Sequence, residues 1–358
     1  MQSIKTKSAV VHFNSKVYIE LNSYIKYTNP SSIFILVDTN THDLCLPKFM
    51  AQLENGDIQT EVMEMPEGED HKTIDICMGV WEAMSQYGAD RQSLLINLGG
   101  GVVTDLGGFV ACTYMRGINY INVPTSLLAM VDASVGGKTG VDLGPLKNQV
   151  GVISEGEMVL IDTSYLDTLP QNQMVSGFAE MLKHGLITDK NYWHTLTHLE
   201  NLDISDLDQI IYDSVVIKNT IVSEDPTEKE LRKTLNFGHT IGHAIESYFL
   251  ENDEKRTLLH GEAIAVGMIL ESFISTKICG LSTVALSEIS EGILKTFAKV
   301  EIDKKDHEHI IDFMKHDKKN SHGIVKFVLL EAIGKAKINC EVSNEIILEA
   351  FEYYKNLS

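Results

Sequence analysis

Residues 93–111 read SLLINLGGGVVTDLGGFVA, an apolar run followed by a glycine-rich turn and the start of a helix. The three glycines at 99–101 would let the backbone approach a pyrophosphate, and the helix start adds N–H groups and the positive end of its dipole. The stretch lacks the G-x-G-x-x-G fingerprint, so a tight turn with close helix packing at Gly107 and Gly108 is the plainer alternative. The order of strand, glycines and helix favours a phosphate cradle.

Short β-branched runs alternate with helix-like segments on either side of this stretch. The predicted strands lie at residues 32–38, 58–65, 93–101, 120–124 and 158–162. Amphipathic segments at 44–53 and 73–87 separate the first three strands, which is the β-α-β order of a mostly parallel sheet. Such sheets commonly bind nucleotides at the carboxyl ends of their strands. Asp38 and Glu69 stand just past two strand ends and could bind ribose or adenine, although a turn or helix-cap role is more usual.

The spacing of apolar residues changes after about residue 169, where they recur every three or four positions. Examples are residues 174–187, 207–222, 263–277 and 287–297. A chain of 358 residues is longer than a typical single core. We therefore predict two domains, an α/β domain at residues 1–169 and an all-α domain at residues 170–358.

The composition argues against several classes of protein. A formal net charge of −20 disfavours a nucleic-acid or anionic-membrane surface, because such partners need a basic patch. The five cysteines are widely spaced and form no C-x-x-C pair, which predicts reduced thiols. The first residues lack the apolar core of a signal peptide, and no run reaches the ~18 apolar residues of a membrane span. We therefore expect a soluble, cytoplasmic protein.

A second glycine-rich loop, SVGGKTG at 134–140, displays Lys138. It is not a Walker P-loop, because Asp132 occupies the position of the first required glycine. Lys147 and Asn148 follow closely along the chain. Exposed lysines are usually solvated, but a lysine flanked by glycine and small apolar residues is a better candidate for binding an anion.

A helix-like segment, SGFAEMLKHG at 176–185, places Glu180, Lys183 and His184 on one helix face. A solvent-facing ion pair is the plain alternative there.

The richest polar stretch covers residues 232–262 and contains Arg232, Asn236, His239, His243 and His260. A lone histidine is more often structural than a metal ligand, but a carboxylate with three histidines fits a zinc-type site. By spacing alone, the two histidines four residues apart, His239 and His243, would be the metal pair.

Six motifs together resemble the 3-dehydroquinate synthase family over about residues 30 to 340. They are GGGVVTDLGGFVA, PTSLLAMVDASVGGKTGVD, KNQVG, SGFAEMLKHG, LRKTLNFGHTIGHAIE and HGEAIAVGM, in that order along the chain. The resemblance implies a Rossmann-like N-terminal domain, an α-helical C-terminal domain and a homodimer. It also implies a lyase of the shikimate pathway that uses NAD⁺ and a divalent metal. Its reaction would convert 3-deoxy-D-arabino-heptulosonate 7-phosphate to 3-dehydroquinate and phosphate.

The resemblance also implies a different metal site from the one that spacing suggests. Its ligands would be Glu180, His239 and His260, a set suited to Zn²⁺ or Co²⁺. His243 would then stand beside the metal and help proton transfer.

The remaining polar residues receive roles from the same resemblance. The substrate phosphate would be bound by Lys138, Asn148, Asn236, one of Lys318 and Lys319, and Arg116 of the partner subunit. The substrate carboxylate would be bound by Lys218 and Arg232. The substrate hydroxyls and the nicotinamide region would be oriented by Asp132, Lys147 and Lys183. Catalysis would involve His243, Lys138, Lys183, Asp132, Asn148 and Lys147. The NAD contacts would be Asp38, Asn40, Glu69, Lys72, Gly100, Gly101, Asp105, Thr125, Ser126, Asp132, Lys147 and Thr168.

Three other functions are considered. Another sugar-phosphate cyclase would share the cofactor and metal, but a substrate without a carboxylate would leave Lys218 and Arg232 with less to bind. A metal-dependent polyol dehydrogenase would release NADH with its product. An NAD-binding regulatory protein would not need the full set of polar residues.

Overall fold

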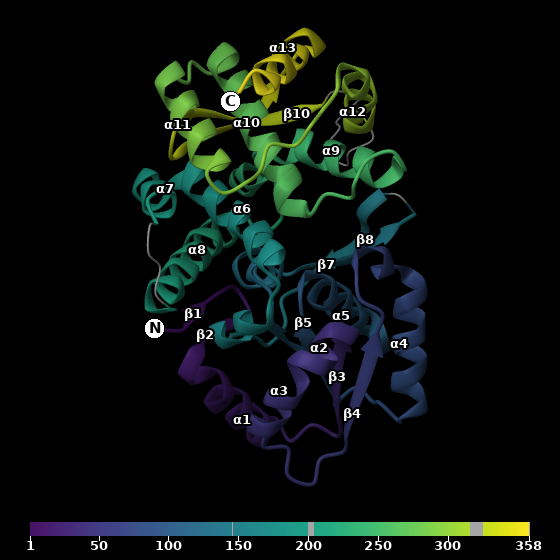
Figure 1. The fold of residues 1–358 in the computed structure, drawn as a ribbon. Coiled ribbons are helices and arrows are strands. Elements are labelled where there is room, and N and C mark those ends of the chain that lie inside the picture. The colour runs from purple at the N-terminus through teal and green to yellow at the C-terminus, as the bar shows by residue number, and fades with distance from the viewer. Residues whose placement is uncertain (145, 200–203, 316–324, 358) are drawn as a thin grey trace. The chain divides into compact units, whose positions relative to one another are not determined.

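A seven-stranded sheet forms the framework of the first of two units into which the chain divides (Figure 1). The computed structural model describes residues 1–144, 146–199, 204–315 and 325–357. The strand order is β1-β2-β9-β6-β5-β3-β4, and neighbouring strands are parallel except β1 with β2. The bounds are β1 Ile4–Lys5, β2 Val10–Phe13, β3 Ile33–Asp38, β4 Thr60–Met65, β5 Leu94–Gly99, β6 Asn119–Pro124 and β9 Met158–Ile161. All five predicted strands are present.

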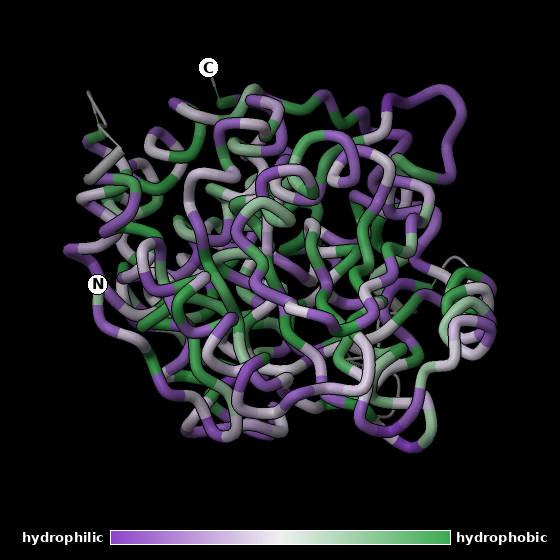
Figure 2. The backbone as a smooth tube through the Cα atoms, turned by 90° about the horizontal axis from the view of Figure 1, so that it is seen from below, coloured by the Kyte–Doolittle hydropathy of each residue, from purple (hydrophilic) through white to green (hydrophobic). Residues whose placement is uncertain are grey.

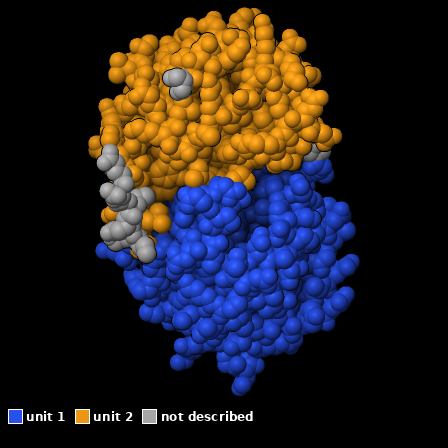
Figure 3. Space-filling model, in the orientation of Figure 1, with its two compact units in different colours: residues 1–174, 211–223 blue, residues 175–210, 224–358 orange. Residues whose placement is uncertain are grey.

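The units are not continuous in sequence (Figure 3). The first comprises residues 1–174 with 211–223, and the second comprises 175–210 with 224–358. Part of helix α8 (Ile204–Glu224) therefore belongs to the first unit, where Tyr212 packs edge-on against Phe13 with ring centroids 5.1 Å apart. Spatial units of this kind do not test where a folding domain ends, so the predicted division after residue 169 stays a prediction.

Helices and a small hairpin complete the first unit. They are α1 Val17–Thr28, α2 Thr39–Leu44, α3 Leu46–Gln52, α4 Ile74–Gln86, α5 Gly101–Thr113, and the antiparallel pair β7 Lys138–Leu143 and β8 Leu146–Ile153. The predicted helical segment at 44–53 is a separate helix after α2, with Pro47 in its first turn. Proline suits that position because the first N–H groups of a helix have no partner within it.

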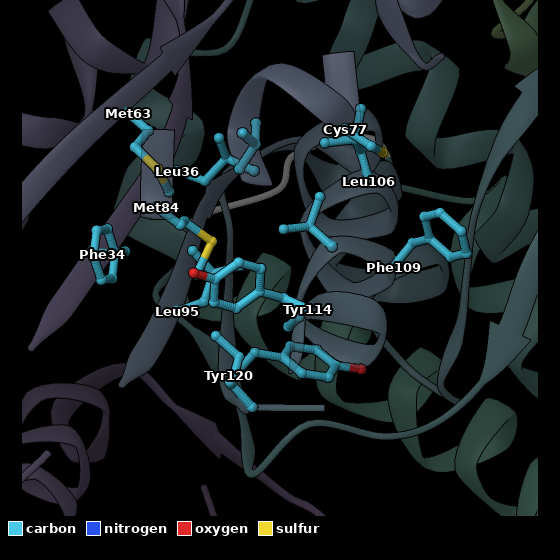
Figure 4. Packing of buried hydrophobic residues seen from close by; sticks show 14 of the residues in the cluster. Phe34, Leu36, Met63, Cys77, Met84, Leu95, Leu106, Phe109, Tyr114 and Tyr120 are labelled. Carbon is cyan, nitrogen blue, oxygen red and sulfur yellow. The ribbon is translucent and has the colours of Figure 1, made fainter. Parts of the chain in front are cut away.

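The core of the first unit lies where α4 and α5 cover strands β3, β4 and β5 (Figure 4). Strand β5 is buried along its whole length, as expected for a central strand of a parallel sheet covered on both faces. Helix α5 comes close to the sheet through glycines. A Cβ atom at Gly107 would lie 2.0 Å from Oδ1 of Asn97, and one at Gly108 would lie 2.4 Å from Cγ2 of Thr139. The close helix packing that was the plainer alternative for this stretch is therefore present at these two glycines.

The second unit is mainly helical, and α10 runs through its centre. The helices are α6 Gln171–Thr188, α7 Lys190–Thr197, the first turns of α8, α9 His239–Glu251, α10 His260–Ile278, α11 Thr283–Leu294, α12 His307–Lys315 and α13 Asn344–Lys355. Helix α10 packs against α9, α11, α13 and strand β10, and buried residues lie on all its sides. A helix that is apolar all round belongs at the centre of its unit.

The second unit also contains a hairpin that the sequence prediction missed. Strands β10 (Lys326–Ala332) and β11 (Lys335–Glu341) pair antiparallel, with Gly334 at φ +87° in the turn. The sequence KAKINCE alternates polar and apolar residues with the period of a strand, so the signal was present. The predicted fold class, an α/β unit joined to a helical unit, is confirmed.

Hydropathy follows this arrangement. Short hydrophobic and hydrophilic stretches alternate along the chain, and several of the outermost loops are hydrophilic (Figure 2). Within the described ranges, no helix combines the length and apolar character needed to cross a membrane.

The glycine contact between α5 and the sheet generates a stability prediction. Gly107→Ala should destabilise the protein by about 1–3 kcal/mol, because the new methyl group would overlap the buried Asn97 amide. Gly79→Ala is the control. Gly79 lies within α4 with no atom within 4 Å of a built Cβ, so alanine there should leave stability unchanged or raise it by up to about 1 kcal/mol. Urea unfolding measures both; equal midpoints for the two variants would contradict the packing argument.

Candidate functional site

Three helices of the second unit bring an acid and two histidines to one point. Glu180 lies within α6, while His239 and His260 are the first residues of α9 and α10. The Oε1 atom of Glu180 lies 3.4 Å from Nε2 of His239 and 3.4 Å from Nε2 of His260. Glu180 is fully buried, and His239 is only 8% exposed. Glu180 lies 59 positions before His239 in the sequence, and the two histidines are 21 positions apart. The fold thus brings three distant residues into one cluster.

The other ring nitrogen of each histidine is fixed by an acceptor. Nδ1 of His239 lies 3.0 Å from the carbonyl oxygen of Phe237, and Nδ1 of His260 lies 3.3 Å from Oε2 of Glu246. Because a carbonyl or carboxylate oxygen accepts, each Nδ1 donates. In the neutral ring this places the lone pair on Nε2, facing Glu180. Metal-binding histidines are commonly oriented in this way by a carbonyl or carboxylate.

The geometry fits a divalent cation. Oε1 of Glu180 forms no hydrogen bond of good geometry within the described part of the chain, although it is buried. A tetrahedral Zn²⁺ site with metal–ligand distances of about 2.1 Å would separate its ligand atoms by about 3.4 Å, which is the spacing found here. One carboxylate oxygen and two imidazole nitrogens suit Zn²⁺ or Co²⁺. The residues therefore fit the metal that the resemblance implies.

The charges around this cluster set its protonation. Burial opposes ionisation of Glu180, but the adjacent ammonium of Lys183 outweighs burial and holds the pKa of the acid well below its usual range. Lys183, itself 1% exposed on the next turn of α6, donates to Oε2 of Glu180. Burial, reinforced by Lys183, lowers the pKa of His239 and keeps the ring neutral. Burial also opposes a proton on His260, but Glu246 and Glu180 outweigh it and raise the pKa to about 10.

His243 lies one helical turn after His239 on α9. Its ring centroid is 5.0 Å from that of His239 and 5.7 Å from that of His260. Ligand nitrogens of the three histidines lie within 4.8 Å of one another, so the pair suggested by spacing is also within reach of one ion. Glu180 would contribute an anionic ligand, and its Oε1 lies 3.4 Å from Nε2 of His239 and of His260. The ligand assignment stays a prediction, and this contact favours the set implied by the resemblance.

Glu246 was given no role by the sequence analysis. It is 7% exposed on α9, three residues after His243, and contacts Nδ1 of His260. Its position on the same helix face as His243 was the available signal.

Two further residues of the second unit lie near the start of α9. The guanidinium of Arg232, 2% exposed, donates to the carbonyl oxygen of Pro226 at 2.9 Å. The amide of Asn236 donates to Oε1 of Glu228 at 2.7 Å. Lys318 and Lys319 lie outside the described residues.

The first unit has its own polar cluster around the buried Lys72. Its Nζ donates to Oδ2 of Asp105 at 2.6 Å and to Oδ1 of Asn148 at 2.7 Å. Burial opposes the charge on Lys72, but Asp105 and Glu69 outweigh burial and raise its pKa. Burial raises the pKa of Asp105, and Lys72 limits that rise. Lys147 lies 3.9 Å from Oε1 of Glu69. Four residues predicted for the cofactor and one for the substrate phosphate are thus brought together.

A second ion pair in the first unit joins Lys218 of α8 to Asp132. Nζ of Lys218 lies 2.7 Å from Oδ1 of Asp132 and also donates to its backbone carbonyl. Lys218 is 5% exposed, so its positive charge is compensated by the carboxylate of Asp132 rather than by solvent. The two residues are 86 positions apart in the sequence, so no local pattern indicated that they would pair.

The glycine turn after β5 lies at the carboxyl edge of the sheet. Asp38 ends β3, and Thr125 follows β6 at the same edge, since the three strands are parallel. A Cβ atom at Gly100 would come no closer than 3.4 Å to Ser126, and one at Gly101 no closer than 3.5 Å to Ala133. Packing therefore does not require these two glycines. A phosphate group lying against the start of α5 would explain them, so the turn fits NAD.

Other predicted residues have ordinary local roles as well. Asp38 accepts from the N–H of Thr41 at 2.8 Å and caps α2, which is the plain alternative for this residue. Thr168 donates to the carbonyl oxygen of Tyr165 at 2.8 Å. Asn40 is exposed on α2, and Lys138 is exposed at the start of β7.

Arg116 is exposed after α5, with φ +69°. Met115 beside it has φ +48° and is 44% exposed. Left-handed backbone is uncommon for such residues and carries a cost in free energy.

Comparison with known proteins identifies the family. Residues 62–176 match the family described as "3-dehydroquinate synthase N-terminal", and residues 177–320 match "3-dehydroquinate synthase C-terminal". The chain is 41% identical over 338 residues to 3-dehydroquinate synthase of Parabacteroides distasonis, covering 94% of this chain and 95% of the relative. It is 37% identical over 349 residues to the enzyme of Thermoanaerobacter pseudethanolicus, covering 96% and 97%.

Solved structures with the same fold include two other cyclases. A 2-epi-5-epi-valiolone synthase from Streptomyces hygroscopicus subsp. jinggangensis, with NAD⁺ and Zn²⁺ bound, superposes with a TM-score of 0.86 at 24% identity, covering 99% of both chains. A 2-deoxy-scyllo-inosose synthase complexed with carbaglucose-6-phosphate, NAD⁺ and Co²⁺ gives 0.84 at 25% identity, covering 98% and 100%. An iron-containing alcohol dehydrogenase gives 0.69 at 12% identity, covering 100% of both. These cyclases are less similar to the chain in sequence than the two relatives above are. Because the chain matches both of those relatives and both parts of the family description, it belongs to the 3-dehydroquinate synthase family.

Proposed function

We propose that this chain is a 3-dehydroquinate synthase, a lyase of the shikimate pathway that converts 3-deoxy-D-arabino-heptulosonate 7-phosphate to 3-dehydroquinate and phosphate. The observation that carries the proposal is the convergence of Glu180 Oε1 with two imidazole Nε2 atoms at 3.4 Å. The substrate is inferred from relatives of that name at 37% and 41% identity over nearly the whole chain.

The proposal includes two cofactors. NAD⁺ supplies a reversible hydride acceptor, and Zn²⁺ or Co²⁺ supplies positive charge that lowers the pKa of a bound alcohol and polarises a carbonyl. Glu180, His239 and His260 would hold the metal. The turn at Gly100 and Gly101, with the other predicted contacts in the first unit, would hold the nucleotide.

The protein's own groups account for binding and proton movement. Lys183 keeps Glu180 ionised, so the acid stays a ligand rather than taking a proton. His243 lies beside the two histidine ligands and would carry the proton of the substrate hydroxyl that is oxidised. Arg232 is buried and presents a planar cation, which suits the substrate carboxylate. In the first unit, Lys72 fixes Asn148, a residue assigned to the substrate phosphate.

The assembly is proposed to be a homodimer in which Arg116 reaches the phosphate bound by the partner subunit. Its exposure and left-handed backbone support this, because such strain is commonly kept where a side chain has a function. A cytoplasmic location is also proposed, since all five cysteines are free thiols, as expected in a reducing compartment.

The function is tested by phosphate release from the heptulosonate phosphate. The enzyme should release phosphate without net formation of NADH, and a chelator should stop the reaction. Accumulation of NADH with product would identify a polyol dehydrogenase. That alternative is tested because an iron-containing alcohol dehydrogenase shares this fold. Turnover of sedoheptulose 7-phosphate or glucose 6-phosphate, with none of the heptulosonate phosphate, would identify another cyclase.

Two histidine variants test the ligand assignment. His260→Ala should lose both stoichiometric metal and turnover, because it removes a ligand. His243→Ala should retain the metal while turnover falls about 10²–10⁴-fold, the usual contribution of a proton-transfer group. Metal content by elemental analysis and the initial rate are measured on both variants. Full metal in His260→Ala, or loss of metal in His243→Ala, would restore the pair suggested by spacing.

Subunit mixing tests Arg116. Arg116→Ala and Glu180→Ala should each be inactive as homodimers. Co-expressed with different tags, they should form a mixed dimer with one intact site, because that site takes Glu180 from one subunit and Arg116 from the other. Such a dimer should regain about half the wild-type rate, since one of its two sites is whole. An inactive mixed dimer would show that Arg116 acts within its own subunit.

A further inference from the structure

We infer that Glu271 and Ser176 are positioning residues that fix the metal ligands by capping ligand-bearing helices from outside. Each caps the start of a helix to which it does not belong. The inference rests on the proposed function, because it takes Glu180, His239 and His260 as the ligands.

Helix α9 cannot cap its own start. Its first residue is His239, and the preceding residue, Gly238, is in the left-handed region at φ +77° and has no side chain. The first N–H groups of a helix have no partner within it, so a start without a cap tends to fray. A metal ligand at that position therefore needs support from elsewhere.

Glu271 of α10 supplies this support. Its Oε2 accepts from the N–H of Gly238 at 2.7 Å, and its Oε1 accepts from the N–H of Ile241 at 3.2 Å. These are the two donors that a capping box satisfies with side chains of the same helix. Here one carboxylate from a neighbouring helix accepts from both. Glu271 is fully buried, and a buried carboxylate is favourable only when such donors surround it.

Close contact between the two helices makes this reach possible. A Cβ atom at Gly267, one turn before Glu271, would lie 1.9 Å from the carbonyl oxygen of Gly238. A Cβ atom at Gly242 would lie 2.8 Å from Cδ1 of Ile264. The backbones of α9 and α10 thus touch along one turn, which brings the side chain of Glu271 beneath the start of α9.

The start of α10, which carries His260, has one cap of its own and one from another helix. Within α10, Oε2 of Glu262 accepts from the N–H of Leu259 at 2.8 Å. The N–H of Gly261 donates to Oγ of Ser176 at 2.9 Å. Ser176 is 2% exposed on α6, one turn before Glu180. A Cβ atom at Gly261 would lie 2.0 Å from the carbonyl oxygen of Ser176, so α6 and α10 are also in backbone contact.

The caps form a series that includes all three ligand-bearing helices. Helix α6 carries Glu180 and caps α10; helix α10 carries His260 and caps α9; helix α9 carries His239. The spacing of the ligand atoms therefore depends on two hydrogen-bonded contacts that touch no ligand side chain. Displacements of about 0.5 Å among the ligand atoms are enough to impair such a site.

The test compares Co²⁺ binding by the full-length wild type, Glu271→Gln, Ser176→Ala and a control. The glutamine keeps the size of the side chain and replaces one acceptor with a donor facing the helix N–H groups. Asp306→Asn is the control. Asp306 is a fully buried carboxylate of the same unit that accepts from the N–H of Asp303 and the hydroxyl of Tyr248, both at 2.8 Å. Co²⁺ affinity and the visible spectrum of the bound ion are measured, with circular dichroism to show that each variant is folded.

Glu271→Gln and Ser176→Ala should bind Co²⁺ about 10- to 100-fold more weakly, the usual cost of losing a group that orients ligands, and should shift the Co²⁺ spectrum. Asp306→Asn should match the wild type in both, whatever its melting temperature. Ser176→Ala removes a single oxygen and keeps the inference testable if Glu271→Gln does not fold. Wild-type affinity and spectrum in the folded cap variants, or an equal loss in Asp306→Asn, would overturn the inference alone. Failure of the wild type to bind Co²⁺ would overturn the metal site and the inference with it.

Discussion

Oε1 of Glu180 and the Nε2 atoms of His239 and His260 face one another in the second unit, and a positive charge among these three atoms makes the arrangement favourable. Oε1 of Glu180 meets Nε2 of His239 and His260, while both Nδ1 atoms are committed to acceptors behind the rings. Neither ring can turn its N–H toward the acid without losing that bond. When no ion is present, Glu246 and Glu180 raise the pKa of His260 to about 10, so this ring carries the positive charge at neutral pH. A divalent cation held by Glu180 and the two Nε2 atoms would replace that proton.

The strong negative charge of the chain and its proposed anionic substrate are compatible because the buried lysines assigned to the site are local charges, each paired with an acid. Lys183 contacts Glu180, Lys72 contacts Asp105, and Lys218 contacts Asp132, each lysine being 5% exposed or less. A buried ion pair keeps both partners charged while contributing little net stability. The paired acids thus keep these lysines positively charged at fixed positions in a chain whose formal net charge is −20.

Glycine serves two opposite purposes in this chain. At Gly107, Gly261 and Gly267 a Cβ atom would come within 2.0 Å of a neighbour, so glycine lets two elements touch. At Gly100 and Gly101 nothing lies closer than 3.4 Å, and glycine leaves a helix start open to a ligand. The glycine pairs at 100–101 and 107–108 look alike in the sequence. The atoms that would contact a side chain at each pair come from other segments of the chain, so the sequence pattern does not separate the two roles.

The five strands around the glycine turn, the helical character of the second half and, through ordered motifs, the family could all be predicted without a structure. Local patterns suffice for these because apolar periodicity and turn residues act over a few positions. Spacing alone paired His239 with His243, since both lie on one turn of α9. Only the packing of the helices reveals the contacts that favour His260 and Glu180 instead. The same is true of the support from Glu246 and of the caps from Ser176 and Glu271. They join helices far apart in sequence, and their distances depend on how closely glycine-bearing helices pack.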